Sequence, residues 1–508
     1  MKRRQFLSLS AGAGMVGLAG CTLGTGTDSP KNEGPTVALE EVVTGVTFPT
    51  GMVFLPGGDR LIVERTGQVL RHTDSGLARE LFVDVSDRMA EVEGERGLVG
   101  IALHPDFTEN RRLFLRYSGQ LPDSMSADDY SHLGVLAEFQ ANEELTGVVE
   151  DSERRILEVP EPGPMHNAGA LSFGPDGYLY AAFGDGQRTS FEEGKSWWYD
   201  QGQAAQNITG NLLGGILRLD VDNTDGDKPY AVPDDNPLVG EEGRDEYYAW
   251  GFRNPYKISI DDGRLFVGDV GEHTRESVYM AEEGANHGWP IKEGSSCAPS
   301  TSIGHSIADN PLNVFNPKTW QALTNRVSPV KACATPKHAK GEIIDPIVEY
   351  QRSGSRAVTG GYVYRGDGIP ELQGQYVFGD YMQPAPLFAV DPDHDGGRPY
   401  PVQELTVEGT DSGRLNSNVL SFARDPDGEV YVLTTNFQEE VDSSVGSLRQ
   451  TELTRAVAAR EPSRRRRCRF HRRHPRPRPH RRPAVGSRPP WRPARRRPRA
   501  RESGPRLV

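Results

Sequence analysis

The sequence predicts an all-β fold, a six-bladed β-propeller of four-stranded antiparallel blades with long inserted loops. Between residues 37 and 450, short strands rich in Val, Leu, Tyr and Phe alternate with Gly, Asp, Pro and Asn turns, and few stretches have a helical period. A phrase of strand, tight turn and strand recurs at Gly51–Arg65, Gly169–Gly186, Lys257–Gly271 and Val419–Thr435. Hairpins repeated over roughly 400 residues are typical of propeller blades of about 40 to 70 residues each. A β-sandwich, the alternative, rarely needs so long a chain.

Residues 1–20 have the features of an export signal. Arg3 and Arg4 precede an apolar run, Leu7–Leu18, which leads into Leu-Ala-Gly and Cys21. A twin arginine indicates export of an already folded protein, and the run is shorter than the roughly 20 residues that span a bilayer. We therefore expect a lipid on Cys21. The Gly/Thr/Ser/Pro-rich residues 21–36 are then a flexible tether to the outer face of the cytoplasmic membrane, where the lipid anchor alone holds the protein.

Charge divides the rest of the chain into two unlike parts. Residues 451–508 hold 21 Arg and three acidic residues, which leaves 37 basic against 68 acidic side chains, a net charge of −31, in residues 1–450. Such an excess disfavours nucleic-acid partners and, with only ten Lys in the chain, indicates a halophilic protein. An ordinary acidic secreted protein is the alternative.

The Arg/Pro-rich residues 451–508 have too few apolar side chains to form a core, so we predict a disordered tail. A frame-shifted translation of GC-rich sequence would give the same abrupt change in composition. A nucleic-acid or lipid-binding arm is the less favoured interpretation.

Two cysteines, Cys297 and Cys333, belong to the predicted propeller. In an oxidising compartment they are expected to form a disulfide that closes a Pro/Ser-rich loop. Metal binding is less favoured because neither has a second cysteine or a histidine at zinc-finger spacing.

Seven strings between residues 94 and 366 carry a family resemblance. In chain order they are GERGLVGIALHPDF, MHNAGALSFGPDGYLYAAFGDG, NLLGGILRLDVD, WGFRNPYKIS, GDVGEHTRESV, GANHGWP and TGGYVYRG. Together they resemble the soluble glucose and aldose sugar dehydrogenases that use pyrroloquinoline quinone (PQQ), which are six-bladed propellers. The resemblance covers most of residues 40–440. It implies oxidation of an aldose, or a related alcohol, to the lactone with hydride transfer to PQQ. Because the protein is expected to be exported and tethered, we expect a membrane carrier as its electron acceptor.

Three residues in these strings suit that chemistry. Oxidation of a sugar hydroxyl needs a base for its proton and positive charge near the reduced quinone. His166 follows a Pro-Gly-Pro turn, where a loop residue can reach a central cavity, and the resemblance makes it the general base. A lone histidine is more often structural, but the motif favours the base. The resemblance also implies that Arg253 and Asn254 contact PQQ, since arginine offers a fork of donors to the quinone oxygens.

The resemblance implies a metal and a substrate contact as well. Calcium, which takes hard oxygen ligands, would bind the main-chain carbonyls of Gly271 and Glu272 and act as a Lewis acid. Glu95 falls where the family has a polar side chain that contacts the sugar.

One segment departs from the family's pattern. Where relatives often carry a basic residue for the cofactor carboxylates, Gly379–Phe388 has no Arg or Lys. Arg352 and Arg356 are the replacements we expect, and the predicted cofactor contacts are completed by Arg356 and Thr359.

Two other functions remain open from the sequence. One is a non-enzymatic extracellular propeller that serves as a binding module, since the missing basic residue is what a lapsed cofactor site would show. The other is a calcium-dependent lactonase, which needs a cluster of carboxylates around a central metal. The order of the motifs favours the dehydrogenase.

Overall fold

The computed structural model describes residues 31–186, 204–272, 274–297, 340–352 and 356–436, and the backbone of residues 451–458. All of them belong to one compact unit, Met1–Ala459. The predicted export signal, Cys21, Cys333 and residues 459–508 lie outside the described residues.

Strands dominate the described residues, and the predicted all-β propeller is confirmed. The short helical pieces are α1 (Phe107–Asn110), η1 (Ser86–Arg88), η3 (Ala204–Gln206) and η5 (Pro370–Leu372). None of the helices in this part of the chain is long and apolar enough to span a bilayer.

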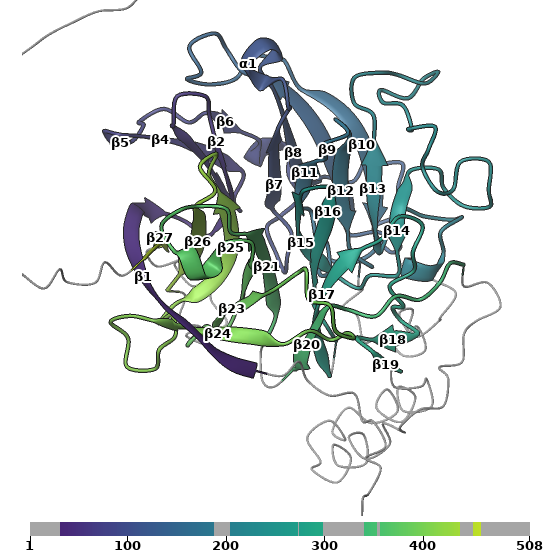
Figure 1. Ribbon diagram of the computed structural model, residues 1–508. Coiled ribbons are helices and arrows are strands. Elements are labelled where there is room, and N and C mark those ends of the chain that lie inside the picture. The colour runs from purple at the N-terminus through teal and green to yellow at the C-terminus, as the bar shows by residue number, and fades with distance from the viewer. Residues whose placement is uncertain are drawn as a thin grey trace, which may run out of the picture. The chain divides into compact units, whose positions relative to one another are not determined.

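Four antiparallel sheets follow one another along the chain (Figure 1). The first holds β2 (Pro49–Phe54), β3 (Arg60–Glu64), β4 (Gln68–Thr73), β5 (Gly76–Leu77) and β6 (Val83–Asp84). The second holds β7 (Leu98–Leu103), β8 (Arg112–Gly119), β9 (His132–Gln140) and β10 (Arg154–Glu161). The third holds β11 (Leu171–Phe173), β12 (Leu179–Phe183), β13 (Gly215–Leu219) and β14 (Tyr247–Trp250). The fourth holds β15 (Pro255–Asp261), β16 (Arg264–Asp269), β17 (Arg275–Ala281) and β20 (Val348–Gln351). A small hairpin of β18 (Lys292–Glu293) and β19 (Ser296–Cys297) lies between the last two of these strands in sequence.

The remaining strands form one eight-stranded sheet instead of two separate blades. Its order is β21 (Val358–Val363), β22 (Tyr376–Asp380), β23 (Leu387–Val390), β24 (Val402–Val407), β1 (Lys31–Val46), β27 (Thr451–Ala458), β26 (Val430–Thr435) and β25 (Asn418–Arg424). The described residues therefore contain five large sheets, and the predicted count of six separate blades is not confirmed. The reason is β1, which pairs in parallel with β24 and antiparallel with β27 and so joins the two halves.

That sheet also differs from the predicted domain boundaries. β1 begins within residues 21–36, assigned to the tether, and β27 lies within residues 451–508, assigned to the tail. The segment TELTRAVA of β27 has one Arg and no Pro, and it precedes the Arg/Pro-rich composition. A composition averaged over the whole tail hides this short segment.

All four recurring phrases form the predicted hairpins, β2–β3, β11–β12, β15–β16 and β25–β26. The last two turns need a glycine, because Gly263 and Gly428 have φ values of 73° and 89°. In this left-handed region a side chain is strained, whereas glycine is not.

The core lies between neighbouring sheets. Val63 packs with Leu98 and Leu115 between the first and second sheets, and Met52 packs with Leu433 between the first sheet and β26. The two halves of the eight-stranded sheet pack on each other through side chains that include Val377, Leu387, Phe422 and Val432. The eight-stranded sheet is therefore curled, and the ring of packed sheets closes on itself.

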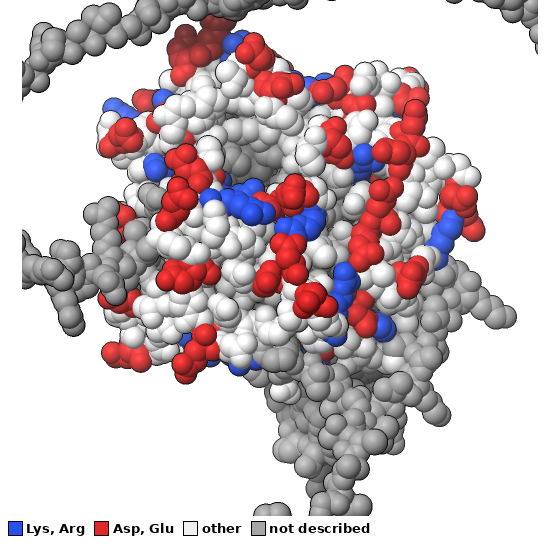
Figure 2. Space-filling view, viewed as in Figure 1, with Lys and Arg blue, Asp and Glu red and all other residues white. Residues whose placement is uncertain are grey.

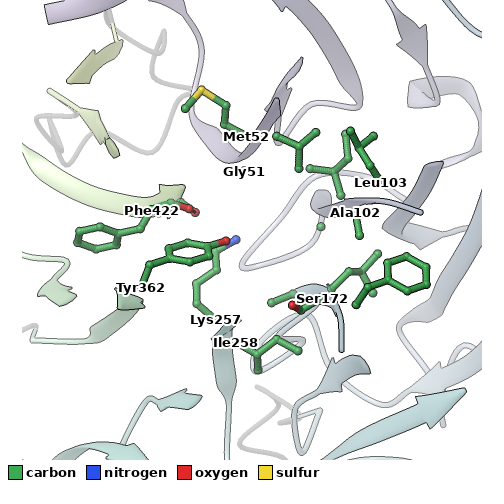
Figure 3. A pocket seen from close by; sticks show the side chains of 16 residues that line it. Gly51, Met52, Ala102, Leu103, Ser172, Lys257, Ile258, Tyr362 and Phe422 are labelled. Carbon is green, nitrogen blue, oxygen red and sulfur yellow. Dashed lines mark hydrogen bonds between the residues drawn. The ribbon is translucent and has the colours of Figure 1, made fainter. Parts of the chain in front are cut away.

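The innermost strands of the ring, which are the first strands of the four-stranded units, surround a cavity of about 200 Å³ (Figure 3). Its lining comes from β2, β7, β11, β15, β21 and β25 and from Ala170 just before β11. We call it the axial cavity. Lys257 projects into it beside Tyr362. On the outside, acidic side chains are spread over the face shown in Figure 2, and a group of basic side chains lies near its middle.

Candidate active site

A second, larger cavity of about 840 Å³ lies at the N-terminal ends of the first strands of the sheets, among them β2, β7, β21 and β25. Thr50 and Val99 line it from the beginnings of β2 and β7, and Thr359 and Leu420 line it from β21 and β25. Lys257 lies between the two cavities, because its ammonium group donates to the carbonyls of Thr50 at 2.5 Å and Val99 at 3.5 Å.

Most of the predicted site residues meet in this larger cavity. Its lining includes Glu95, His166, Arg253, Asn254, Glu272 and Thr359. Gly271 and Arg356 are not part of the lining, although Arg352 is. Motifs separated by more than 260 residues in the sequence therefore converge at one place.

The hydrogen bonds of His166 define which of its ring nitrogens donates and which accepts. It is only 4% exposed, with Nδ1 2.7 Å from Oδ1 of Asp185 and Nε2 2.5 Å from Nη2 of Arg253. Because a guanidinium group can only donate, Nε2 must accept, and the ring proton then lies on Nδ1 and is donated to Asp185. In this arrangement the lone pair of the ring lies on Nε2 and points toward Arg253.

Asp185, which the sequence analysis did not single out, orients this imidazole. Its second oxygen, Oδ2, accepts a hydrogen bond of 2.8 Å from the indole of Trp289, and its own N–H donates to the carbonyl of Arg253 at 2.7 Å. The side chain is 2% exposed. The available signal was the FGDG string directly after β12, but nothing in that string says which histidine the carboxylate will face.

The backbone around His166 is tightly fitted to the end of β12. His166 has a φ of 56°, a conformation that non-glycine residues rarely adopt. Its carbonyl accepts from the N–H of Gly186 at 3.1 Å, and a Cβ on Gly184 would lie 2.0 Å from the same carbonyl oxygen. The approach therefore requires glycine at position 184. Strain of this kind is often kept at functional sites, where surrounding contacts hold it.

Arg253 is buried and held from several sides. Nη1 donates to the carbonyl of Val270 at 2.8 Å, Nη2 forms an ion pair with Glu272, and the guanidinium group lies 5.7 Å from the ring centre of Trp289. Burial lowers the pKa of Arg253, but the charges of Glu272 and Asp185 more than offset it, so that the net pKa is raised. The side chain therefore keeps its positive charge.

Asp269 fixes the turn that carries Arg253 and Asn254. Its carboxylate accepts from the backbone N–H of Arg253 at 3.1 Å and of Asn254 at 2.7 Å. Burial raises the pKa of Asp269 to about 7, although these two N–H groups favour the charged form. The turn thus depends on a buried carboxylate at the end of β16.

Asn254 connects the loop that carries His166 to the predicted substrate ligand, Glu95. Its Oδ1 accepts from the N–H of Ala168 at 3.1 Å, two residues after His166, and its Nδ2 donates to Oε2 of Glu95 at 3.0 Å. Glu95 also accepts from the N–H of Asn167 at 3.3 Å. These contacts hold Glu95 beside the His166 loop.

One of the two predicted calcium ligands has a protein partner, because the carbonyl of Gly271 accepts a short hydrogen bond from Arg352. The other predicted ligand is the carbonyl of Glu272, and the side chain of the same residue pairs with Arg253. In the part of the chain that the structure describes, no group of three or more His, Cys, Asp or Glu side chains could hold a metal ion.

Of the two arginines predicted to replace the missing basic residue, Arg352 lines the cavity and Arg356 does not. Arg352 lines the cavity, but it is engaged by Glu276 at 2.8 Å as well as by Gly271. Burial raises the pKa of Glu276 to about 8, and the charge of Arg352 opposes this shift. Arg65, at the end of the first recurring phrase, lines the cavity as well and was missed.

Of the two cysteines in the predicted disulfide, the structure describes Cys297. Cys297, in β19, is disulfide-bonded. Cys333 lies outside the described residues.

Comparison with known proteins identifies the family. The sequence profile described as Glucose / Sorbosone dehydrogenase matches residues 46–321, more than half of the chain. The chain belongs to this family. As a member of the glucose/sorbosone dehydrogenase family, it is 29% identical over 442 residues to the HIPL1 protein of Arabidopsis thaliana, with 76% of this chain and 57% of that protein covered. It is 26% identical over 422 residues to the aldose sugar dehydrogenase YliI of Escherichia coli, with 80% of this chain and 92% of that protein covered.

The match to the first curated relatives is partial in length. This family member spans about half to three fifths of the HIPL proteins and of the human Hedgehog-interacting protein.

Solved structures share the fold. The apo-form of the soluble aldose sugar dehydrogenase from Escherichia coli is 22% identical with a TM-score of 0.57, covering 84% of this chain and 100% of that one. The PQQ-bound form of the aldose sugar dehydrogenase from Streptomyces coelicolor is 21% identical with a TM-score of 0.52, covering 83% and 99%.

Proposed function

We propose that this glucose/sorbosone dehydrogenase family member is a PQQ-dependent dehydrogenase that oxidises an aldose, or a related alcohol, to the lactone. The observation that carries the proposal is the Asp185–His166–Arg253 chain in the larger cavity. It places Nε2 of His166, the nitrogen that carries the lone pair, against Arg253, so the proposed base lies next to a permanent positive charge.

The cavity suits an anionic, hydrogen-bonding cofactor. Oγ1 of Thr359 is buried and without a hydrogen-bond partner, and Nε of Arg253 is in the same situation. Buried polar atoms are rarely left unpaired, so these two favour a ligand that pairs with them. Arg253, Asn254 and Thr359 would hold PQQ. When bound, PQQ supplies the acceptor for the hydride.

His166 would take the proton of the sugar hydroxyl at Nε2. To do so, it must exchange its contact with Arg253 for a contact with the hydroxyl group. Asp185 would then stabilise the imidazolium that forms, because its carboxylate already accepts from Nδ1. Glu95, held by Asn254, is placed to accept a second sugar hydroxyl.

Calcium is part of the proposal through the main-chain carbonyls of Gly271 and Glu272. Hard oxygens of this kind suit calcium, which would act as a Lewis acid. Binding there requires Arg352 to release the Gly271 carbonyl. Calcium should therefore change the environment of Arg352.

We further propose that the protein is exported and anchored through Cys21, and that it delivers electrons to a membrane carrier. The twin-arginine and Cys21 pattern supports this location. Cys21→Ala should move the protein from the membrane fraction to the soluble fraction. An unchanged membrane fraction would refute the lipid anchor.

The function is tested by titrating the purified full chain with PQQ in the presence of calcium and following quinone absorbance. Dye reduction is then measured with a panel of aldoses. We expect saturable binding and sugar-dependent reduction that needs PQQ. A protein that neither binds PQQ nor reduces the dye would favour the binding-module alternative, which the similarity to Hedgehog-interacting proteins keeps in view. Lactone hydrolysis without quinone would favour the lactonase.

A further inference from the structure

The arginines that line the larger cavity differ in whether a carboxylate of the protein pairs with them. Arg253 forms an ion pair with Glu272, and Arg352 forms one with Glu276 at 2.8 Å. Arg65 lines the same cavity, yet no hydrogen bond or ion pair with a described residue engages its guanidinium group. It is the cavity arginine whose charge is left for a ligand.

The side chain of Arg65 is nevertheless held in place. Its backbone is fixed on both sides, because its N–H donates to the carbonyl of Phe48 at 3.2 Å and its carbonyl accepts from Leu98 at 2.9 Å. The stem passes so close to Gly97 that a Cβ there would lie 2.4 Å from its Cγ. The guanidinium group lies 4.6 Å from the ring centre of Phe48. A cation–π contact of this kind orients the group without using its N–H donors.

The carboxylate of Glu95 acts on Arg65, but it has hydrogen-bond partners of its own. Glu95 is close enough to act on Arg65 electrostatically, as are Tyr256 and Tyr381. However, the Glu95 carboxylate accepts from Asn254 and from the N–H of Asn167. Burial lowers the pKa of Arg65, and these neighbours only partly offset it. An anion beside Arg65 would therefore be favourable.

The segment after β22 adds no cation to this side of the cavity. Tyr381 lines the cavity directly after β22, and the residues that follow, up to Phe388, include neither Arg nor Lys. We propose that Arg65, from the first sheet, binds a carboxylate of the quinone cofactor through its unused N–H donors. This inference rests on the proposed function, because PQQ is the carboxylate-bearing ligand in question. Guanidinium and carboxylate groups match each other in a two-pronged hydrogen bond.

The test compares PQQ with its trimethyl ester, in which the carboxylates are capped, by absorbance titration of the full chain. Arg65→Gln should lower the affinity for PQQ about 10- to 100-fold, as expected for a charge-assisted hydrogen bond. Its affinity for the ester should change little. Arg65→Lys, which keeps the charge, should recover part of the PQQ affinity.

The matched control is Arg71→Gln, which removes one arginine charge from the same sheet. Arg71 pairs with Asp59 at 2.6 Å and does not line the cavity. It should bind PQQ as the wild type does.

Equal PQQ affinity in Arg65→Gln and wild type would overturn the inference and leave the proposed function intact. An equal loss for PQQ and its ester would also overturn it, since the defect would then be one of packing. A wild-type chain that does not bind PQQ at all would refute the proposed function and the inference with it.

Discussion

Asp185→Asn should abolish the function of His166 as a base, and so lower turnover, without lowering the affinity for PQQ. In the wild type, Oδ2 of Asp185 accepts from the indole of Trp289 at 2.8 Å, and Oδ1 accepts from Nδ1 of His166 at 2.7 Å. In the variant, the indole N–H can only face the amide oxygen, so the amide NH₂ group must face His166. Nδ1 then becomes an acceptor, and the ring proton moves to Nε2.

The new tautomer fails for two reasons. Nε2 no longer has a lone pair for the sugar hydroxyl, and its N–H now opposes Nη2 of Arg253, a second donor 2.5 Å away. Loss of general-base catalysis alone should lower turnover by roughly 10²–10⁴-fold. Removal of a charge-assisted hydrogen bond should also lower the free energy of unfolding by about 1.5–3 kcal/mol.

Single-turnover reduction of bound PQQ with saturating aldose measures the first effect, and quinone titration measures cofactor affinity separately. Asp234→Asn, on an exposed loop, is the control for the lost charge and should behave as the wild type. Wild-type turnover in Asp185→Asn would refute the tautomer argument. A large loss of PQQ affinity would show that Asp185 acts on the cofactor site instead.

Six further perturbations test other parts of the structure. His166→Ala should keep PQQ binding but lower turnover by at least roughly 10²-fold. Arg253→Ala should weaken both quinone affinity and turnover. The quinone titration and the single-turnover assay described above measure these two quantities in each variant. Burial lowers the pKa of Lys257 from 10.5 to about 8, so its charge destabilises the folded state below pH 8 and this cost fades between pH 8 and 10.5. Lys257→Met should therefore raise the free energy of unfolding at pH 7 by up to about 2 kcal/mol, and a gain that persists above pH 10.5 in denaturant titrations would contradict this cause. Truncation after Ala459 should leave the unfolding temperature unchanged, whereas truncation after Gln450 removes β27 from between β1 and β26 and should lower it. The unfolding midpoint should rise between low and molar salt as the net charge of −31 on residues 1–450 is screened, and a midpoint independent of salt would remove the halophilic interpretation.

Local patterns predicted the hairpins and the residues that meet in the cavity. Each hairpin phrase contains its own turn glycine and strand alternation, so its structure needs no information from elsewhere in the chain. His166 and Asn254 lie on segments that lead into inner strands, and the ring geometry brings such segments together. The motifs therefore identified the cavity even though the number of separate sheets differed from the prediction.

Pairing between distant segments could not be predicted in the same way. β1 joins β24 across more than 350 residues, and nothing in the polar sequence of its first residues indicates that partner. Asp185 and Arg65 were missed for the same reason. Their roles depend on which side chains face them after the ring has closed, namely His166 for Asp185 and Phe48 with Glu95 for Arg65.

The contacts of Arg253 connect the proposed base to the proposed cofactor site. One guanidinium group covers Nε2 of His166, pairs with Glu272 and donates to the carbonyl of Val270. If His166 is the base, this guanidinium group must leave Nε2 before a hydroxyl group can approach it. In the proposed mechanism, a sugar hydroxyl that displaces Nη2 would meet the lone pair of Nε2. The same displacement would leave an N–H of Arg253 free to face developing negative charge. Exposure of the base and provision of that donor would thus be one movement of one side chain, which would link proton removal to reduction of the cofactor.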